Sequence, residues 1–134
     1  MPGLTLQRTV AASPERVWAA LTDAGALAAW FWPPALRTEV ELDPRRGGGY
    51  VIHAPDQMTV RGTYQEVEPP YRLRFSWRWD GEAEQTEVAI DLSTVDDGTA
   101  VALTHDGFAS DASRDNHITG WSDCLDRLPG FLVG

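Results

Sequence analysis

Apolar and polar positions along the chain follow two different periods, and the change between them predicts the order of the elements. Residues 4–10 alternate in the manner of a strand with one buried face. Ser13 and Pro14 are then typical of a helix start, because serine caps free backbone N–H groups and proline has none to satisfy. Apolar residues follow at helical spacing, at Val17, Ala20, Leu21 and Ala24. We predict a helix from Pro14 and a second, short helix over residues 24–30, ended by the two prolines that follow it.

From residue 35 onward the apolar period changes to two. The clearest case is the segment 72–79, in which apolar side chains alternate with arginine and serine, at Leu73, Phe75, Trp77 and Trp79. The same alternation recurs over residues 36–42, 88–92 and 101–105, and turn-forming sequences rich in Gly, Pro and Asp lie between these segments. We predict six antiparallel strands in a meander, and therefore an α+β fold with a curved sheet of about seven strands.

The last part of the chain returns to helical spacing. Apolar residues recur at threes and fours, at Ile118, Trp121, Leu125, Leu128 and Leu132. On the polar side, Asp123 and Arg127 are one turn apart, where opposite charges can pair. Pro129 is expected to bend or end this helix early. One amphipathic helix laid against one curved sheet would bury the apolar faces of both.

Composition and charge narrow the classes of function. A chain of 134 residues fits one domain, over residues 1–134, with a core of its own. The net charge is −9 and the 11 basic residues, all arginine, are scattered, which disfavours nucleic acid as a partner. The longest apolar run is too short for a membrane span, and the first ten residues lack a signal-peptide pattern. We therefore expect a cytoplasmic protein, without an internal disulfide because there is one cysteine.

The segment 116–128 holds a histidine, two aspartates and the cysteine, but its spacing does not favour catalysis. His117 and Cys124 are seven residues apart, which places them about 10 Å apart along a helix. That separation is too large for two ligands of one zinc ion or for a nucleophile bonded to its base. We predict no metal and no cofactor. Cys124 is expected to be buried, and His117 to be exposed, with a place on a pocket rim as the alternative.

Seven segments, in family order and at family spacing, resemble the Hsp90 ATPase activator homologue family of the START-like, or SRPBCC, superfamily: SPERVWAALTD, WFWPP, DPRRGGGY, GTYQEVEPPYRLRFSW, TEVAIDL, GTAVALTHDGF and GWSDCLDRL. The resemblance extends from about residue 4 to residue 132. It implies a helix-grip fold, in which the sheet wraps around the last helix and encloses an apolar cavity. It also implies a glycine turn at residues 47–49, a proline turn at residues 69–70, and a last helix seated by Gly120 and Trp121.

The sequence departs from the family pattern in two respects, and each leads to an expectation. The cochaperone that gives the family its name has an additional amino-terminal domain without a counterpart in this sequence, so we expect no direct stimulation of Hsp90. A last helix that stops at Pro129 would leave the far end of the cavity open or shallow.

The first functional hypothesis is the binding of a small hydrophobic or aromatic molecule. The chain has six tryptophans, and aromatic walls with a few polar groups suit such ligands. The predicted ligand-binding residues are Trp30, Trp32, Tyr50, Tyr64, Phe75, Trp77, Trp79, His105, His117, Trp121 and Cys124. The alternative for these rings is that they fill the core.

Two other hypotheses come from different classes. The second hypothesis is a protein-interaction module, regulatory or cochaperone-like, that would use the WFWPP loop. We expect this loop to be exposed, either as a lid over the cavity or as an apolar patch that binds a partner. A homodimer formed through the loop is a variant of this hypothesis. An enzyme would be a cyclase, dehydratase or hydrolase of a hydrophobic substrate. Its candidate residues are His53, His105, His117, Tyr64 and Arg8, which falls on the apolar side of its strand and would want a carboxylate partner. No catalytic motif supports this third reading.

Overall fold

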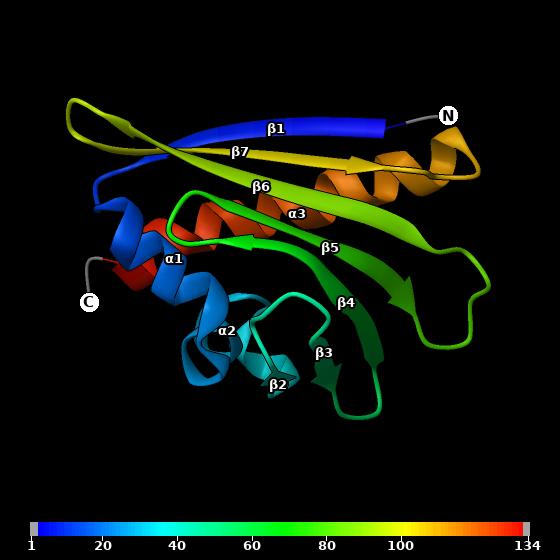
Figure 1. Ribbon diagram of the computed structural model, residues 1–134. Coiled ribbons are helices and arrows are strands. Elements are labelled where there is room, and N and C mark those ends of the chain that lie inside the picture. Colours follow the sequence, from blue (N-terminus) through cyan, green and yellow to red (C-terminus); the bar gives the residue numbers. More distant parts are fainter. Residues whose placement is uncertain (1–2, 133–134) are drawn as a thin grey trace.

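The computed structural model describes residues 3–132, and the four remaining residues of the predicted domain lie outside the described part. The elements, in chain order, are β1 (Gly3–Val10), α1 (Pro14–Thr22), α2 (Ala24–Trp30), a 3-10 turn (Pro34–Leu36), β2 (Glu39–Leu42), β3 (Gly49–Ala54), β4 (Met58–Glu68), β5 (Arg72–Trp79), β6 (Thr86–Val95), β7 (Gly98–Asp106) and α3 (Asp111–Leu132). This order confirms the predicted α+β class (Figure 1).

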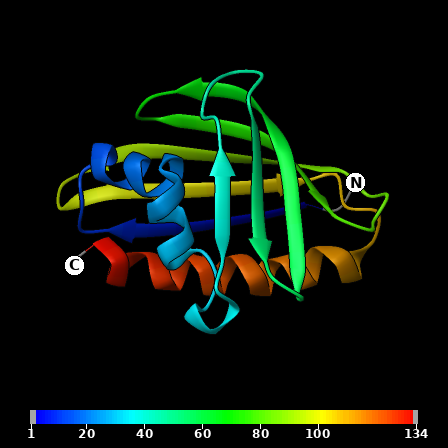
Figure 2. The same ribbon diagram turned by 90° about the horizontal axis from the view of Figure 1, so that it is seen from below.

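The seven strands form one antiparallel sheet in the order β1-β7-β6-β5-β4-β3-β2. A shift of register in β4 between Tyr64 and Glu66 marks a bulge, which helps the sheet to bend. In Figure 2 the strands β2 to β4 cross β5 to β7 at a steep angle, and α3 extends along the inner side of the curve. The sheet therefore grips α3, as the helix-grip fold requires.

Local sequence signals explain where the first helices begin and end. The Ser13 side chain accepts a hydrogen bond from the Arg16 backbone N–H at the start of α1. Asp23 does the same for Ala26 at the start of α2, 2.9 Å from donor to acceptor. The predicted bounds of α2 are those observed.

Glycine is needed at two places in the turn before β3. Gly47 has a φ of 87°, in the region that favours glycine. A Cβ on Gly48 would overlap the carbonyl oxygen of Asp43. These constraints confirm the glycine turn that the resemblance implies.

The helix α3 does not end at Pro129, contrary to the prediction. It continues through this proline to Leu132. Leu128 and Leu132 are buried on the two sides of Pro129, so their packing outweighs the backbone hydrogen bond that a proline cannot donate. The carbonyl oxygen of Leu132 also accepts a hydrogen bond from the Arg16 guanidinium of α1. The far end of the fold is therefore closed by α3 and α1.

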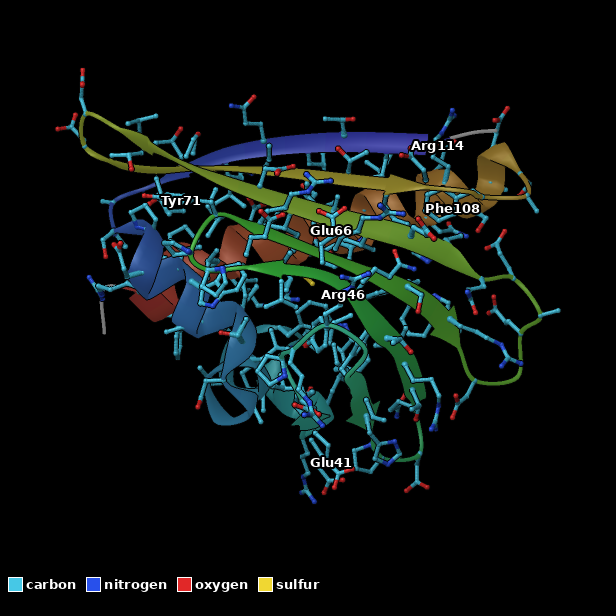
Figure 3. All side chains as sticks on the ribbon, viewed as in Figure 1. Glu41, Arg46, Glu66, Tyr71, Phe108 and Arg114 are labelled. Atoms are coloured by element: carbon cyan, nitrogen blue, oxygen red, sulfur yellow. The ribbon has the colours of Figure 1, made fainter. Side chains whose placement is uncertain are left out.

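The outer face of the sheet carries paired charges. Arg72 contacts Asp91 at 2.6 Å and Glu66 at 2.8 Å, and Arg74 contacts Glu66 and Glu87 at 3.2 and 3.0 Å (Glu66 is labelled in Figure 3). These arginines hold the pKa values of Glu66 and Glu87 below their usual range through hydrogen bonds. Arg72 and Arg74 are thus neutralised by carboxylates of the neighbouring strands. Within the described part of the chain, no helix combines the length and the apolar character that a bilayer crossing requires.

Candidate ligand cavity

A cavity of about 500 Å³ lies beside α3, between the segment after α2 and the adjoining ends of β4 and β5. Its apolar and aromatic lining includes Phe31, Trp32, Leu36, Met58, Trp77, Trp79 and Trp121. Its polar lining consists of Glu82, Asn116, His117, Asp123, Cys124 and Arg127. The volume lies within the range of small-molecule sites, which are concave and mostly apolar.

Four indole rings form one continuous wall of this cavity. Trp32 and Trp79 stack with their ring centroids 6.1 Å apart and their planes inclined by 10°. Trp77 meets Trp79 at right angles with the centroids 5.4 Å apart, and Trp121 lies 5.0 Å from Trp77. Offset stacking and edge-to-face contacts are the arrangements that aromatic rings prefer, so the wall is internally stable without a ligand.

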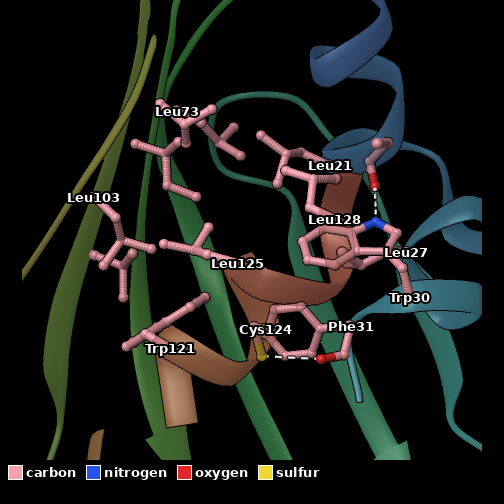
Figure 4. Packing of buried hydrophobic residues seen from close by; sticks show 14 of the residues in the cluster. Leu21, Leu27, Trp30, Phe31, Leu73, Leu103, Trp121, Cys124, Leu125 and Leu128 are labelled. Atoms are coloured by element: carbon pink, nitrogen blue, oxygen red, sulfur yellow. Dashed lines mark hydrogen bonds between the residues drawn. The ribbon is translucent and has the colours of Figure 1, made fainter. Parts of the chain in front are cut away.

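The WFW segment is buried, and the predicted exposure of this loop is wrong. Trp30, Phe31 and Trp32 are 3%, 4% and 7% exposed. The Trp30 indole N–H donates to the carbonyl oxygen of Ala20 in α1, and the Cys124 thiol donates to the carbonyl oxygen of Phe31 (Figure 4). The segment is therefore fixed on both sides, which the prolines alone did not predict.

Arg127 supplies the other contact that closes this segment. Its guanidinium donates to the carbonyl oxygens of Trp30 at 3.1 Å and Phe31 at 2.6 Å. These carbonyls stand at the carboxyl end of α2, where the helix leaves them without an internal partner. The predicted ion pair of Arg127 with Asp123 is wrong for this reason: Arg127 is directed to α2.

A chain of hydrogen bonds fixes His105 inside the core. The Trp121 indole N–H donates to Nδ1 of His105 at 2.9 Å, so this nitrogen carries no proton. Nε2 lies 2.6 Å from the Thr86 hydroxyl, which in turn donates to the carbonyl oxygen of Trp77. The consistent arrangement has Nε2–H donating to Thr86. His105 is thus a neutral ring with both nitrogens satisfied.

His117 is half-buried and lies on the rim of the cavity. The prediction that it is exposed is therefore wrong, and the alternative, a place on a pocket rim, is confirmed. Nδ1 of His117 donates to the carbonyl oxygen of Ser113 at 2.7 Å, and its Nε2 accepts from the Trp79 indole N–H at 2.9 Å. An indole nitrogen can only donate, so Nε2 is unprotonated in this arrangement. His117 therefore orients the cavity wall through Trp79.

Burial shifts the pKa values of two candidate reactive groups away from catalysis. Burial, together with the nearby His117, lowers the pKa of His105 to about 3. Burial also raises the pKa of the Cys124 thiol to about 12, although Arg127 opposes the shift. At neutral pH the histidine does not protonate a substrate and the thiol does not act as a thiolate nucleophile.

The space under the centre of the sheet is filled by side chains. Tyr50, Tyr64 and Phe75 pack edge-to-face or tilted, with their ring centroids 5.3 to 6.0 Å apart. The Tyr50 hydroxyl donates to the carbonyl oxygen of Ser76 at 2.6 Å. A void of only about 30 Å³ remains beside these rings. The hypothesis that the aromatic residues fill the core holds here.

The structure divides the eleven predicted ligand-binding residues into three groups. Those that line the cavity are Trp32, Trp77, Trp79, His117, Trp121 and Cys124. Those that line the small inner void alone are Tyr50, Tyr64 and Phe75, and those that line neither space are Trp30 and His105. Sequence reasoning missed nine lining residues: Phe31, Pro33, Leu36, Met58, Glu82, Asn116, Gly120, Asp123 and Arg127. Phe31 and Pro33 lie within the quoted WFWPP motif, while the others depend on contacts between distant segments.

The remaining enzyme candidates lie apart from the cavity. His53 contacts the Thr59 hydroxyl at 2.6 Å and lies on the face of β3 opposite to Tyr50. Arg8 finds the carboxylate partner that its position requires, because it contacts Asp126 of α3 at 3.3 Å and donates to Ser122 at 3.0 Å. Among the described residues, no three His, Cys, Asp or Glu side chains group as a metal site would require.

The indole nitrogen of Trp77, a residue that lies between the cavity and the small inner void, is a buried donor without a partner in the described part of the chain. Trp77 borders both the cavity and the inner void. Its indole nitrogen is buried without a hydrogen-bond partner among residues 3–132. An unpaired buried donor costs about 1 to 3 kcal/mol.

Comparisons with known proteins agree with this architecture. A protein from Rhodobacter sphaeroides has 30% sequence identity and a TM-score of 0.82, over 98% of this chain and 91% of its own. A protein from Chromobacterium violaceum has 28% identity and a TM-score of 0.82, over 97% and 96% of the two chains. An Hsp90 activator from Plasmodium falciparum shares the fold at 20% identity, with a TM-score of 0.80 over 97% of this chain and 95% of its own.

No curated protein matches the sequence. The model of the family described as "Activator of Hsp90 ATPase homolog 1-like protein" matches residues 11–132. This match extends over all three helices and over six of the seven strands, and it includes every residue that lines the cavity. The chain therefore belongs to the activator of Hsp90 ATPase homolog 1-like family.

Proposed function

We propose that the protein binds a small hydrophobic or aromatic molecule in the cavity beside α3 and does not convert it. The observation that carries this proposal is the cavity itself, with a volume of about 500 Å³ and a wall of four tryptophans. An acceptor atom on the bound molecule would also satisfy the free indole N–H of Trp77 if the ring shifted toward the cavity. The resemblance to the START-like superfamily, many of whose members bind such molecules, supports the same reading.

The states of the polar side chains favour binding over catalysis. His105 is neutral and enclosed, and both nitrogens of His117 are engaged. The Cys124 thiol is protonated and donates to a main-chain carbonyl. A general acid, base or nucleophile needs a free, correctly ionised group within reach of the substrate. These groups instead hold the cavity wall in place.

A protein-interaction role loses its main support. That hypothesis rests on an exposed WFWPP loop, whereas all three aromatic rings of the loop are buried. Exposed aromatic surface is what would mark a docking patch. The buried rings instead contribute two members, Phe31 and Trp32, to the cavity lining.

The proposal can be tested by filling the cavity from its wall. Gly120 lies in α3, lines the cavity, and has open space where a Cβ would stand. The variant Gly120→Leu should therefore fold, and replacing a helical glycine should stabilise α3 slightly. Gly130→Leu is the matched control, because Gly130 is also helical with open space but is not part of the cavity lining.

Binding is measured with N-phenyl-1-naphthylamine, a neutral dye whose fluorescence rises in apolar sites. We expect binding to the parent protein and to Gly130→Leu, and at least a tenfold weaker affinity for Gly120→Leu, on the order of the binding free energy of several buried methylene groups. Equal affinities in all three proteins would refute this site. Native mass spectrometry of the same samples would report any bound molecule, and also the homodimer that the sequence leaves open.

A further inference from the structure

The cavity has acidic side chains at its mouth. Glu82 and Asp123 both line it, and both are exposed. Neither carboxylate forms an ion pair within the described residues. The chain as a whole has a net charge of −9, so the wider field has the same sign. The entrance is therefore negative.

The cationic side chain in the lining, Arg127, is directed mainly at the main chain. Arg127 donates from two of its nitrogens to the carbonyl oxygens of Trp30 and Phe31 and makes a third contact with the Cys124 sulfur at 3.5 Å. His117 uses its N–H on a main-chain carbonyl and presents an acceptor nitrogen to Trp79. An anionic ligand would thus meet two carboxylates without an ion pair within residues 3–132, and one guanidinium, most of whose contacts are already made to the main chain. The charged side chains of the lining therefore leave a net negative charge.

The aromatic wall adds an attraction for positive charge. The face of an indole ring carries negative electrostatic potential, and tryptophan is the ring that binds cations best. Trp32 and Trp79 stack as a pair at the cavity, on the side where Glu82 follows β5. A planar, positively charged ring or an ammonium group lying over this pair would face indole surface and carboxylates together.

We propose that the cavity selects an organic cation, specifically an amine-bearing aromatic molecule. This inference deepens the proposed function and rests on it. The aromatic portion would lie against the indole wall, and the ammonium group would remain at the mouth beside Glu82 and Asp123. A carboxylate-bearing molecule of the same shape would be disfavoured by the same two side chains.

Three ligands of one shape separate this charge preference from simple hydrophobic binding: 2-naphthylmethylamine, 2-naphthylmethanol and 2-naphthylacetate, which are cationic, neutral and anionic at pH 7. Isothermal titration calorimetry should give an amine affinity about tenfold higher than that of the alcohol, as expected from one cation–π contact and two exposed charge pairs. The acetate should bind most weakly. The amine preference should shrink between 20 and 500 mM NaCl, because exposed charges are screened.

The double variant Glu82→Gln/Asp123→Asn should remove the amine preference and leave the alcohol affinity within twofold. Asp96→Asn/Asp97→Asn is the matched control, because it makes the same change of net charge in the β6–β7 turn, outside the cavity lining. It should keep the preference. Equal affinities of the parent protein for amine and alcohol would overturn the charge inference alone, and so would an equal loss in both double variants. Failure of all three ligands to bind would overturn the proposed function as well.

Discussion

Protonation of His105 should make the folded protein markedly less stable in mild acid. The ring is fully buried, with its nitrogens bonded to Trp121 and Thr86, and burial lowers its pKa from 6.5 to about 3. In the unfolded chain the histidine is exposed and titrates near 6.5. Between about pH 6.5 and 3 the unfolded state therefore binds more protons than the folded state, and the free energy of unfolding decreases as the pH falls through this window.

The two pKa values set the magnitude of this loss. Linkage gives about 1.4 kcal/mol per pH unit well inside the window, and about 2 kcal/mol between pH 7 and pH 5. The lowered pKa values of the carboxyls of Glu66, Asp80 and Glu87 add a loss of the same sign. That second loss falls mainly below the ordinary carboxyl pKa, near 4, so pH 5 separates the two effects.

The assay is urea denaturation at pH 7 and pH 5, for the parent protein and for His105→Gln. Glutamine retains a donor and an acceptor but does not titrate in this range. The parent protein should lose about 2 kcal/mol more than the variant between the two pH values. An equal loss in both proteins, or an NMR titration of His105 in the folded protein near pH 6.5, would refute the reasoning.

Three further predictions concern single positions. Arg127→Met keeps the aliphatic stem but removes the guanidinium donors to the carbonyl oxygens of Trp30 and Phe31. Urea denaturation should therefore show a free energy of unfolding lower by about 1 to 3 kcal/mol. An unchanged midpoint would contradict the role given to the guanidinium. Burial raises the pKa of the Cys124 thiol to about 12. The thiol should therefore react with a thiol reagent on the order of 100-fold more slowly in the native protein than in urea. Fast labelling of the native protein would show instead that the segment around Cys124 opens. Gly62→Ala should cost about 3 kcal/mol or more, because the new methyl group would overlap the carbonyl oxygen of Ser76; thermal denaturation with an unchanged Tm would show that the strands separate easily.

Sequence periodicity was sufficient for the elements because their signals are local. The cap at Ser13 and the alternation over residues 72–79 each act within one turn or one strand, and the structure has α1 and β5 there. The proline at 129 was misleading for the opposite reason. Its effect on α3 is decided by the burial of Leu128 and Leu132, which depends on the sheet and on α1.

The candidate site was harder to predict because contacts between distant segments shape it. The WFW segment looks exposed when its prolines are considered alone, but it is enclosed by donors from Cys124 and Arg127, which lie more than 90 residues later in the chain. The position of His117 likewise depends on Trp79. The charge of the cavity mouth could not be predicted either, since Glu82 and Asp123 come from a loop and a helix that meet only in the fold. The cytoplasmic location and the homodimer stay predictions.

The aromatic side chains of the core explain why the cavity lies at one end of the fold. Tyr50, Tyr64 and Phe75 occupy the space under the central strands, where large rings in edge-to-face contact leave a void of only about 30 Å³. Phe31, Trp77 and Trp121 border both this void and the cavity, so these three rings form the partition between filled and open space. On the cavity side of this partition, Trp32 and Trp79 stack and line the open space. On the proposed function, the partition, with its Trp77–Trp121 contact, would set the depth that a ligand reaches, and the polar rim would set which charges the ligand carries.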